Sequence, residues 1–212
     1  MSSPLKVAYF GMQCLWGAES KFSELNGVKK TRVGYAGGTM LNPTYYDLDD
    51  HIEIFEVTYD EKQVTYKELL DFFFAHHNPC EPLKRQYISA LLYVDNEQKV
   101  AAENAIAEQK HKHHLNVYGI QTHVAKLDKF WQAEDYHQKY WLRCEKDIFD
   151  LLKLSDQEVV DSELACKLNC LLAGYKNLEL LNQLAVKYKL PKEVVSAVET
   201  IVKSGGNPRA CH

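Results

Sequence analysis

Apolar and polar positions alternate along the first half of the chain with two different periods, one typical of buried strands and one of amphipathic helices. The strand-like segments are residues 5–11, 28–35, 52–60 and 86–94. The helical segments between them are residues 17–27 and 65–77. The resulting order, β-α-β-β-α-β, predicts an α/β (α+β) sandwich with a ferredoxin-like core, in which helices cover one face of an antiparallel sheet.

The second half of the chain is mostly helical in pattern. The next segments are a charged helix at 96–113, a possible edge strand at 118–127 and a mostly helical stretch at 134–152. From Ser155 onward only helical periodicity remains, in three expected segments separated near Gly174 and Pro191. We therefore expect a first domain of residues 1–153 and a helical extension of residues 154–212 ending in a flexible tail.

The composition and charge of the chain do not indicate a particular binding partner. The chain has 212 residues, 46% of them hydrophobic, which is enough to form a full core. Its 25 Lys and Arg residues oppose 29 Asp and Glu residues, without a long block of either sign. The first residues make a poor signal peptide and are too short to span a bilayer. We expect a cytoplasmic monomer that binds neither nucleic acid nor membrane.

The cysteine pattern indicates neither a disulfide scaffold nor a metal centre. The chain contains six cysteines, which are Cys14, Cys80, Cys144, Cys166, Cys170 and Cys211. They are too sparse for a secreted disulfide framework, and no Cys-x-x-Cys pair occurs. The tract from Lys110 to His114 is more typical of a solvated helix end than of a metal site. We assign no metal and no cofactor.

Cys14 is the first candidate for chemistry. It lies between a buried strand and the start of a helix, where unpaired backbone N–H groups and the helix dipole favour a thiolate. A thiolate is the reactive form of cysteine in nucleophilic catalysis. A lone cysteine at a strand end is nevertheless more often a buried apolar residue, so position alone does not make Cys14 a nucleophile.

Several motifs in order along the chain resemble those of the A-type peptide methionine sulfoxide reductases. That family has the elements Gly-Cys-Phe-Trp-Gly-x-Glu, Gly-Tyr-x-Gly-Gly, Asn-Pro-Thr-Tyr, Gly-His-x-Glu, Gln-Tyr-Arg-Ser and an aromatic-Ala-Glu-x-x-His-Gln segment. The matching stretches here are residues 14–19, 34–38, 42–45, 51–53, 86–89 and 130–140. The resemblance covers roughly residues 7 to 141, about two thirds of the chain, and its α/β sandwich agrees with the predicted element order.

The resemblance implies a role for each candidate residue. Cys14 attacks the sulfoxide sulfur, Glu53 supplies a proton to the leaving oxygen, and Tyr45 and Tyr87 donate hydrogen bonds to that oxygen. Trp16, together with Leu15, forms the wall for the substrate methyl group. The implied substrate is the S epimer of methionine sulfoxide, free or in proteins. Without the resemblance, periodicity places Glu53 at the surface, and the aromatic residues are equally well explained by packing.

The sequence departs from the family pattern at three places. Leu15 replaces the usual Phe, and Gln13 replaces the Gly before the nucleophile. A shorter loop at residues 78–85 replaces Gln-Gly-Asn-Asp-x-Gly-Thr, so an aspartate is missing, and the sequence leaves open whether Glu81 substitutes for it. About 50 helical residues precede the end of the chain, where most family members have a short Gly-rich coil.

Regeneration of the enzyme requires a second thiol. In this family the sulfenic acid left on the nucleophile is attacked by another cysteine, and thioredoxin reduces the resulting disulfide. We assign this resolving role to Cys211, which follows Ser204 to Pro208, a stretch of flexible composition. Cys166 and Cys170 fall on an apolar helical stripe and are expected to be packing residues, although a relay through them stays open.

Two alternatives remain at this stage. Cys14 paired with His51 or His137 would suit a cysteine hydrolase or acyl transferase. A non-catalytic binding module could retain the same fold after losing the loop aspartate. Activity of Cys14→Ser on methionine sulfoxide distinguishes all three hypotheses.

Overall fold

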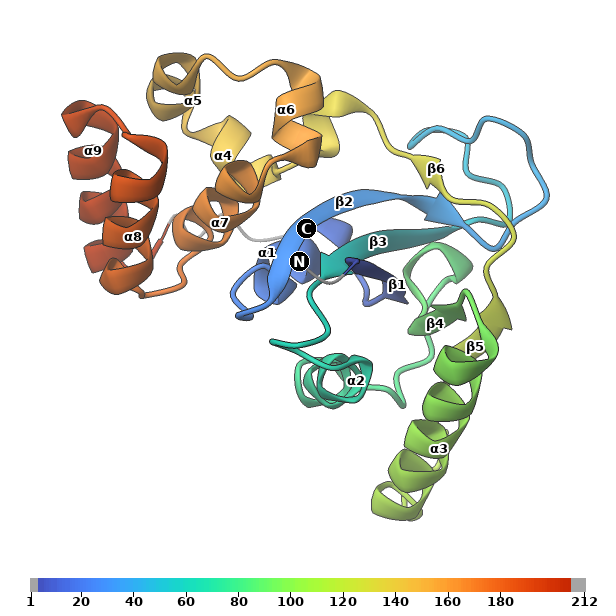
Figure 1. Cartoon of the computed structure of the whole chain (residues 1–212). Helices are drawn as coiled ribbons and strands as arrows, with labels where there is room; N and C mark the ends of the chain where they lie inside the picture. The colour runs from blue at the N-terminus through green and yellow to red at the C-terminus, as the bar shows by residue number, and fades with distance from the viewer. Residues whose placement is uncertain (1–3, 207–212) are drawn as a thin grey trace.

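The computed structural model describes residues 4–206, which form a six-stranded mixed sheet and nine α-helices (Figure 1). The sheet order is β5-β4-β1-β3-β2-β6. The strands are β1 (Lys6–Gly11), β2 (Val28–Ala36), β3 (Ile52–Tyr59), β4 (Ala90–Tyr93), β5 (His123–Lys126) and β6 (Trp131–Gln132). The first three helices are α1 (Leu15–Phe22), α2 (Tyr66–Ala75) and α3 (Asn96–Lys112). The remaining helices are α4 (Tyr140–Cys144), α5 (Lys146–Leu152), α6 (Asp156–Asp161), α7 (Glu163–Leu172), α8 (Leu178–Tyr188) and α9 (Lys192–Ser204).

The predicted β-α-β-β-α-β core is confirmed. Its four strands are adjacent in the order β4-β1-β3-β2, and every neighbouring pair among them is antiparallel. The expected edge strand is also present, as β5, which pairs in parallel with β4. The sequence pattern did not predict β6, a two-residue strand that pairs with β2 at the opposite edge.

Helices α1, α2 and α3 cover one face of this core. Phe10 of β1 and Phe55 of β3 make ring contacts there with each other, with Phe22 of α1 and, from Phe10, with Phe73 of α2. A smaller apolar cluster occupies the other face, where Phe130 packs. Both faces of β3 are therefore covered, and all eight of its residues are buried.

This double coverage explains why periodicity placed Glu53 wrongly. The prediction assumed that a carboxyl group at the start of a strand reaches water. In the structure Glu53 is only 3% exposed, on the same face of β3 as Phe55 and beside the beginning of α1. A strand covered on both faces does not show the one-sided alternation on which such a prediction depends.

Two local boundaries differ from the expectation. Helix α1 begins at Leu15 rather than at residue 17, so Cys14 is its N-cap residue. Gln86 and Tyr87, expected to begin a strand, instead belong to a short 3₁₀ helix, η1 (Arg85–Tyr87), which closes when the Tyr87 N–H donates to the Lys84 carbonyl. The strand itself starts only at Ala90.

The helical extension contains four helices, α6 to α9, instead of the three predicted segments. The unforeseen break lies at Ser162, whose extended backbone ends α6 and whose hydroxyl accepts from the Ala165 N–H to begin α7. The extension packs on β2 through α6 and α7, and on α1 through α7 (Figure 1). The division of the chain near residue 153 stays a prediction. No helix within residues 4–206 is both long and apolar enough to cross a membrane.

Candidate functional site

A cavity of about 350 Å³ opens at the N-terminus of α1. It brings together six of the seven site residues proposed from the sequence. The lining residues are Gln13, Cys14, Leu15, Trp16, Tyr45, Glu53, Leu83, Tyr87 and His137. The seventh proposed residue, Cys211, lies outside the described residues.

The turn between β1 and α1 places Cys14 in this cavity. Cys14 has extended backbone angles, φ −66° and ψ 124°, and its carbonyl accepts the first helical hydrogen bond, from the Ala18 N–H. Its side chain is half-buried. Gln13 before it has φ +61°, in the left-handed region that glycine adopts without strain. The left-handed conformation of Gln13 turns the chain from β1 toward α1, which begins at the residue after Cys14. The sulfur of Cys14 therefore lies by the positive end of that helix.

Glu53 supplies a buried carboxyl group to the same cavity. Its Oε1 accepts from Gln86 Nε2 at 2.7 Å, and its Oε2 accepts from the Leu15 N–H, the first of α1, at 3.2 Å. Burial raises the pKa of Glu53 from 4.5 to about 7, with a further contribution from Cys14, while the two hydrogen bonds oppose the rise. A substantial fraction of this carboxyl group therefore holds a proton at neutral pH.

Two tyrosines add hydroxyl groups. Burial, followed by the nearby Glu53 and Tyr45, raises the pKa of Tyr87 to about 12, so its hydroxyl remains a proton donor at physiological pH. Tyr45 is fixed through its backbone, because its N–H donates to Glu134 Oε1 at 3.0 Å. Both tyrosines line the cavity together with Glu53, so three groups that can carry a proton share its lining.

The apolar wall is formed by Trp16, Leu15 and Leu83. Trp16 stacks on Tyr140 with a centroid separation of 3.9 Å and an interplanar angle of 6°. Its indole Nε1 donates to His137 Nδ1 at 3.0 Å. The indole ring is thus fixed both by stacking and by a hydrogen bond, with its orientation in the cavity determined by the segment that carries His137.

Three lining residues, Gln13, Leu83 and His137, were not proposed as site residues from the sequence, and His137 is the one with side-chain contacts to the proposed residues. It appeared there only as a possible base in an alternative reaction, although it belongs to the segment at 130–140 that carries the family resemblance. Because an indole N–H can only donate, Nδ1 must accept, which places the imidazole proton on Nε2. Burial lowers the pKa of His137, against an opposing effect of Glu134, so the ring is neutral.

His51, the other histidine considered as a partner for Cys14, does not line the cavity. Its Nδ1 accepts from the Gly38 N–H at 3.2 Å, and its Nε2 lies 2.8 Å from the Met40 carbonyl oxygen. These contacts hold the long loop between β2 and β3 in place.

The substituted loop at residues 78–85 contributes two different contacts. Leu83 reaches the cavity wall. Glu81 is not among the lining residues, and its Oε2 instead accepts from Gln13 Nε2 at 2.8 Å. Gln13 and the substituted loop, two of the places at which the chain departs from the family pattern, therefore contact each other.

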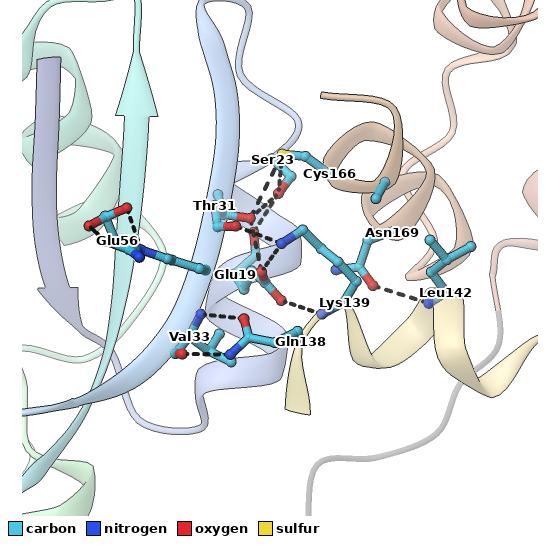
Figure 2. A network of polar contacts seen from close by, with 12 residues as sticks. Glu19, Ser23, Thr31, Val33, Glu56, Gln138, Lys139, Leu142, Cys166 and Asn169 are labelled. Atoms are coloured by element: carbon cyan, nitrogen blue, oxygen red, sulfur yellow. Dashed lines mark hydrogen bonds and ion pairs between the residues drawn. The ribbon is translucent and has the colours of Figure 1, made fainter. Parts of the chain in front are cut away.

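A buried polar network fixes the segment of His137 against α1 and β2 (Figure 2). Lys139 Nζ donates to Glu19 Oε1 at 2.8 Å and to the Thr31 carbonyl at 2.6 Å, and both charged side chains are fully buried. The amide of Gln138 bonds both the N–H and the carbonyl of Val33. Since α1 carries Cys14 and Trp16, this network sets their position relative to His137.

Cys166 and Cys170 lie on α7 in the interior. Cys166 Sγ is 3.2 Å from Ser23 Oγ, and Cys170 Sγ donates to the Lys167 carbonyl at 3.1 Å. Burial raises the pKa of Cys170 well above its usual range. Neither residue lines the cavity of Cys14. Within residues 4–206 no group of three or more potential metal ligands is found.

The site has the features of a thiol-dependent enzyme on an α/β sandwich. It combines a thiol at a helix N-terminus with a buried carboxyl group, two tyrosine hydroxyls and an aromatic side chain. Comparison with known proteins narrows this class. Residues 6–164 match the sequence profile of the peptide methionine sulfoxide reductase family. The chain belongs to this family, in its A type.

Individual relatives agree with this assignment. The peptide methionine sulfoxide reductase of Drosophila melanogaster is 43% identical over 175 residues, which cover 82% of this chain and 70% of that protein. The peptide methionine sulfoxide reductase MsrA of Methanococcus maripaludis is 37% identical, over 65% of this chain and 92% of its own length. Among solved structures, methionine sulfoxide reductase A of Corynebacterium diphtheriae superposes with a TM-score of 0.62 at 33% identity, covering 67% of this chain and 76% of that one.

Proposed function

We propose that this protein reduces methionine sulfoxide to methionine, free or within proteins, with Cys14 as the nucleophile. The observation that supports this proposal most directly is that one cavity is shared by Cys14, by Glu53 with its pKa raised to about 7 and by the aromatic ring of Trp16. A sulfoxide has one basic oxygen and one methyl group, and the lining offers polar groups for the first and apolar side chains for the second.

The first step transfers oxygen from the substrate to Cys14. The thiolate attacks the sulfoxide sulfur while Glu53 gives its proton to the sulfoxide oxygen, which Tyr45 and Tyr87 also contact through their hydroxyls. The substrate S–O bond then breaks as its hydroxyl moves to the Cys14 sulfur, which leaves a sulfenic acid on Cys14, and the transient bond between the two sulfurs breaks to release methionine. The substrate sulfur gains two electrons and the Cys14 sulfur loses two, so the step is balanced with the one proton that Glu53 provides.

The two sides of the cavity also specify the epimer. With the oxygen toward Glu53 and the methyl group against Trp16 and Leu15, only one configuration at sulfur directs the rest of the substrate chain away from Cys14. We assign the S epimer. In the other epimer, oxygen and methyl would exchange places, and an unpaired oxygen would contact the apolar wall.

Cys211 is the proposed resolving thiol, and its reach supports the assignment. The last described residue, Gly206, packs directly against Gly174, which lines a second cavity together with Ser20 and Lys21 from the last turn of α1. Cys14 caps the opposite end of this eight-residue helix, about 12 Å along its axis. Residues 207–211 span at most about 17 Å when extended, which is more than the length of α1.

In the second step the Cys211 thiol attacks the sulfenic acid, forming a Cys14–Cys211 disulfide and releasing water. A dithiol must then return two electrons, and we propose thioredoxin, whose low potential suits this role. The chemistry fits a reducing compartment, so we further propose that the protein acts in the cytoplasm, as a monomer.

The decisive experiment compares Cys14→Ser with Cys144→Ser, since both cysteines are half-buried but only Cys14 lines the cavity. Each variant is assayed on resolved S and R methionine sulfoxide with dithiothreitol as reductant. We expect Cys14→Ser to lose all reduction and Cys144→Ser to reduce the S epimer at the wild-type rate. Wild-type protein that reduced neither epimer, or a Cys14→Ser variant that retained activity, would contradict the proposal.

A further inference from the structure

Five aromatic rings form a continuous run from the cavity to the surface. Trp16 and Tyr45 each contact His137, with ring centroids 5.6 and 4.8 Å apart, and these three residues line the cavity. Tyr46 contacts Tyr45 edge to face at 5.4 Å, and Tyr136 contacts His137 at 4.2 Å. The outer two rings are exposed, Tyr46 by 89% and Tyr136 by 49%.

The two exposed tyrosines are held on firmly anchored backbone. Tyr45 and Tyr46 are the central residues of a tight turn, in which Thr44 and Asp47 exchange both backbone hydrogen bonds at 3.0 Å. Glu134 fastens this turn to the neighbouring segment by accepting from the Tyr45 N–H. Tyr136 belongs to that segment, in the 3₁₀ helix η2 (Asp135–His137).

Burial, Glu134 and then the rings of Tyr46 and Tyr45 raise the pKa of Tyr136, which agrees with the two exposed tyrosines lying near each other. Two fixed aromatic rings are thus offered to solvent, each in contact with a residue that lines the cavity. Exposed aromatic rings on a rigid support are a common means of binding polypeptide, because they bury a large area while losing little side-chain entropy.

We propose that Tyr46 and Tyr136 form a rim that binds the residues flanking methionine sulfoxide in a polypeptide substrate, an inference that rests on the proposed function. When the sulfoxide side chain enters the cavity, the polypeptide backbone must cross its mouth. The neighbouring residues of the substrate then lie over the outer two rings. The occupant of this surface is therefore an extended or unfolded segment, since the residues on both sides of the sulfoxide must be free to lie over the two rings.

The rim also predicts which flanking residues are preferred. Each tyrosine has an exposed carboxylate beside it in the chain, Asp47 next to Tyr46 and Asp135 next to Tyr136. Acidic residues flanking the sulfoxide would meet like charges there, whereas apolar residues would pack on the rings. The rim thus favours apolar over acidic flanks.

The test uses full-length protein and two substrates with blocked ends. One is N-acetyl-methionine sulfoxide amide, which has no flanking residues, and the other is the peptide acetyl-Gly-Leu-Met(O)-Leu-Gly-amide. The readout is the ratio of kcat/KM for the peptide to kcat/KM for the single residue, with dithiothreitol as reductant. We expect the ratio to fall about tenfold in Tyr46→Ala/Tyr136→Ala and to be retained in Tyr46→Phe/Tyr136→Phe, which keeps the rings.

Tyr118→Ala is the matched control, because Tyr118 is 61% exposed but lies in the loop between α3 and β5. The ratio should equal that of the wild type. A peptide with Asp in place of both Leu residues should lower the wild-type ratio. The inference is overturned if the Ala variant keeps the wild-type ratio, or if both substrates lose activity equally, which indicates a structural role. Absence of wild-type activity on the single residue contradicts the proposed function itself.

Discussion

The side chain of Gln13 is held by Glu81, whose Oε2 accepts from Gln13 Nε2 at 2.8 Å. Gln13 precedes Cys14 and has φ +61°, a conformation that costs a non-glycine residue about 1 kcal/mol or more. Glu81 comes from the short loop that replaces the aspartate-bearing loop of the family. This hydrogen bond therefore links an unfavourable backbone conformation at the nucleophile to the loop substitution elsewhere in the chain.

The first prediction concerns this pair. Glu81→Ala should destabilise the protein by about 1 kcal/mol and lower kcat/KM several-fold, because the turn that places Cys14 loses its support. Adding Gln13→Gly should restore both quantities toward the wild-type values, since glycine adopts the turn without strain. Urea unfolding and sulfoxide reduction measure the two effects. If the double variant Glu81→Ala/Gln13→Gly lost as much stability and activity as the two single variants together, the hydrogen bond would not support the turn.

The second prediction concerns the pH dependence of the chemical step. Glu53 must carry a proton to act as an acid, and its pKa is about 7. The rate of sulfenic acid formation in a single turnover should therefore decline as the pH rises through 7, once the ionisation of Cys14 is accounted for. Glu53→Gln should lower the rate roughly 100-fold or more and remove this decline. A decline that persists in Glu53→Gln would assign it to another group.

Glu53 should also affect stability, in a direction that follows from its raised pKa. Between pH 4.5 and 7 the folded protein holds a proton on Glu53 that the unfolded chain releases, so this carboxyl group destabilises the fold increasingly as the pH rises. Above pH 7 the raised pKa of Glu53 lowers the free energy of unfolding by up to about 3 kcal/mol in total. Glu53→Gln should then be more stable than the wild type at pH 8 and similar to it at pH 4.5. Urea unfolding at the two pH values measures the difference; equal effects at both would contradict the assignment.

The buried pair of Glu19 and Lys139 gives a third structural test (Figure 2). Lys139→Met leaves the Glu19 carboxylate without its cation in the interior and should cost about 3–5 kcal/mol. Glu19→Gln in the same protein removes the unpaired charge and should recover part of that loss. If the double variant is as unstable as the sum of both single variants, the charges are not coupled. Trp16 fluorescence offers a second readout, since the same network sets the position of His137.

Much of the fold could be predicted because local patterns match the final structure. The segments of β1 and β3 have the apolar, β-branched and aromatic content of buried strands, the segment of α2 has a capping box and a helical period, and their order is sufficient to define the core. Ser162 shows why the extension was harder: one residue ends α6 and begins α7, and a serine within a long helical pattern is easily taken for a surface position.

The site was predictable where the family resemblance supplied what periodicity lacks. Glu53 illustrates this, since its burial depends on α1 and on cover over both faces of β3, which come from distant parts of the chain. His137 was present in a recognised segment, but its contact with Trp16 joins residues that are 121 positions apart. The contact of Gln13 with Glu81 spans 68 positions, and the sequence indicates only that both residues are unusual.

The last prediction concerns Cys211. A resolving thiol must leave the cavity open while the sulfoxide binds and then reach the sulfenic acid on Cys14. Cys166 and Cys170 are poorly suited to this, because both are buried on α7 and neither lines the cavity. Cys211→Ser should therefore release one equivalent of methionine, accumulate the sulfenic acid on Cys14 and lose turnover with thioredoxin, whereas dithiothreitol should partly restore it.

Cys166→Ala and Cys170→Ala are the matched controls, and both should turn over normally with thioredoxin once corrected for any loss of stability. Mass spectrometry of the wild type after one turnover without reductant should identify a Cys14–Cys211 disulfide. The assignment fails if Cys211→Ser turns over normally with thioredoxin, or if Cys14 is found joined to Cys166 or Cys170. In either case the burst of one methionine per protein would still support Cys14 as the nucleophile, because that step is complete before any second thiol acts.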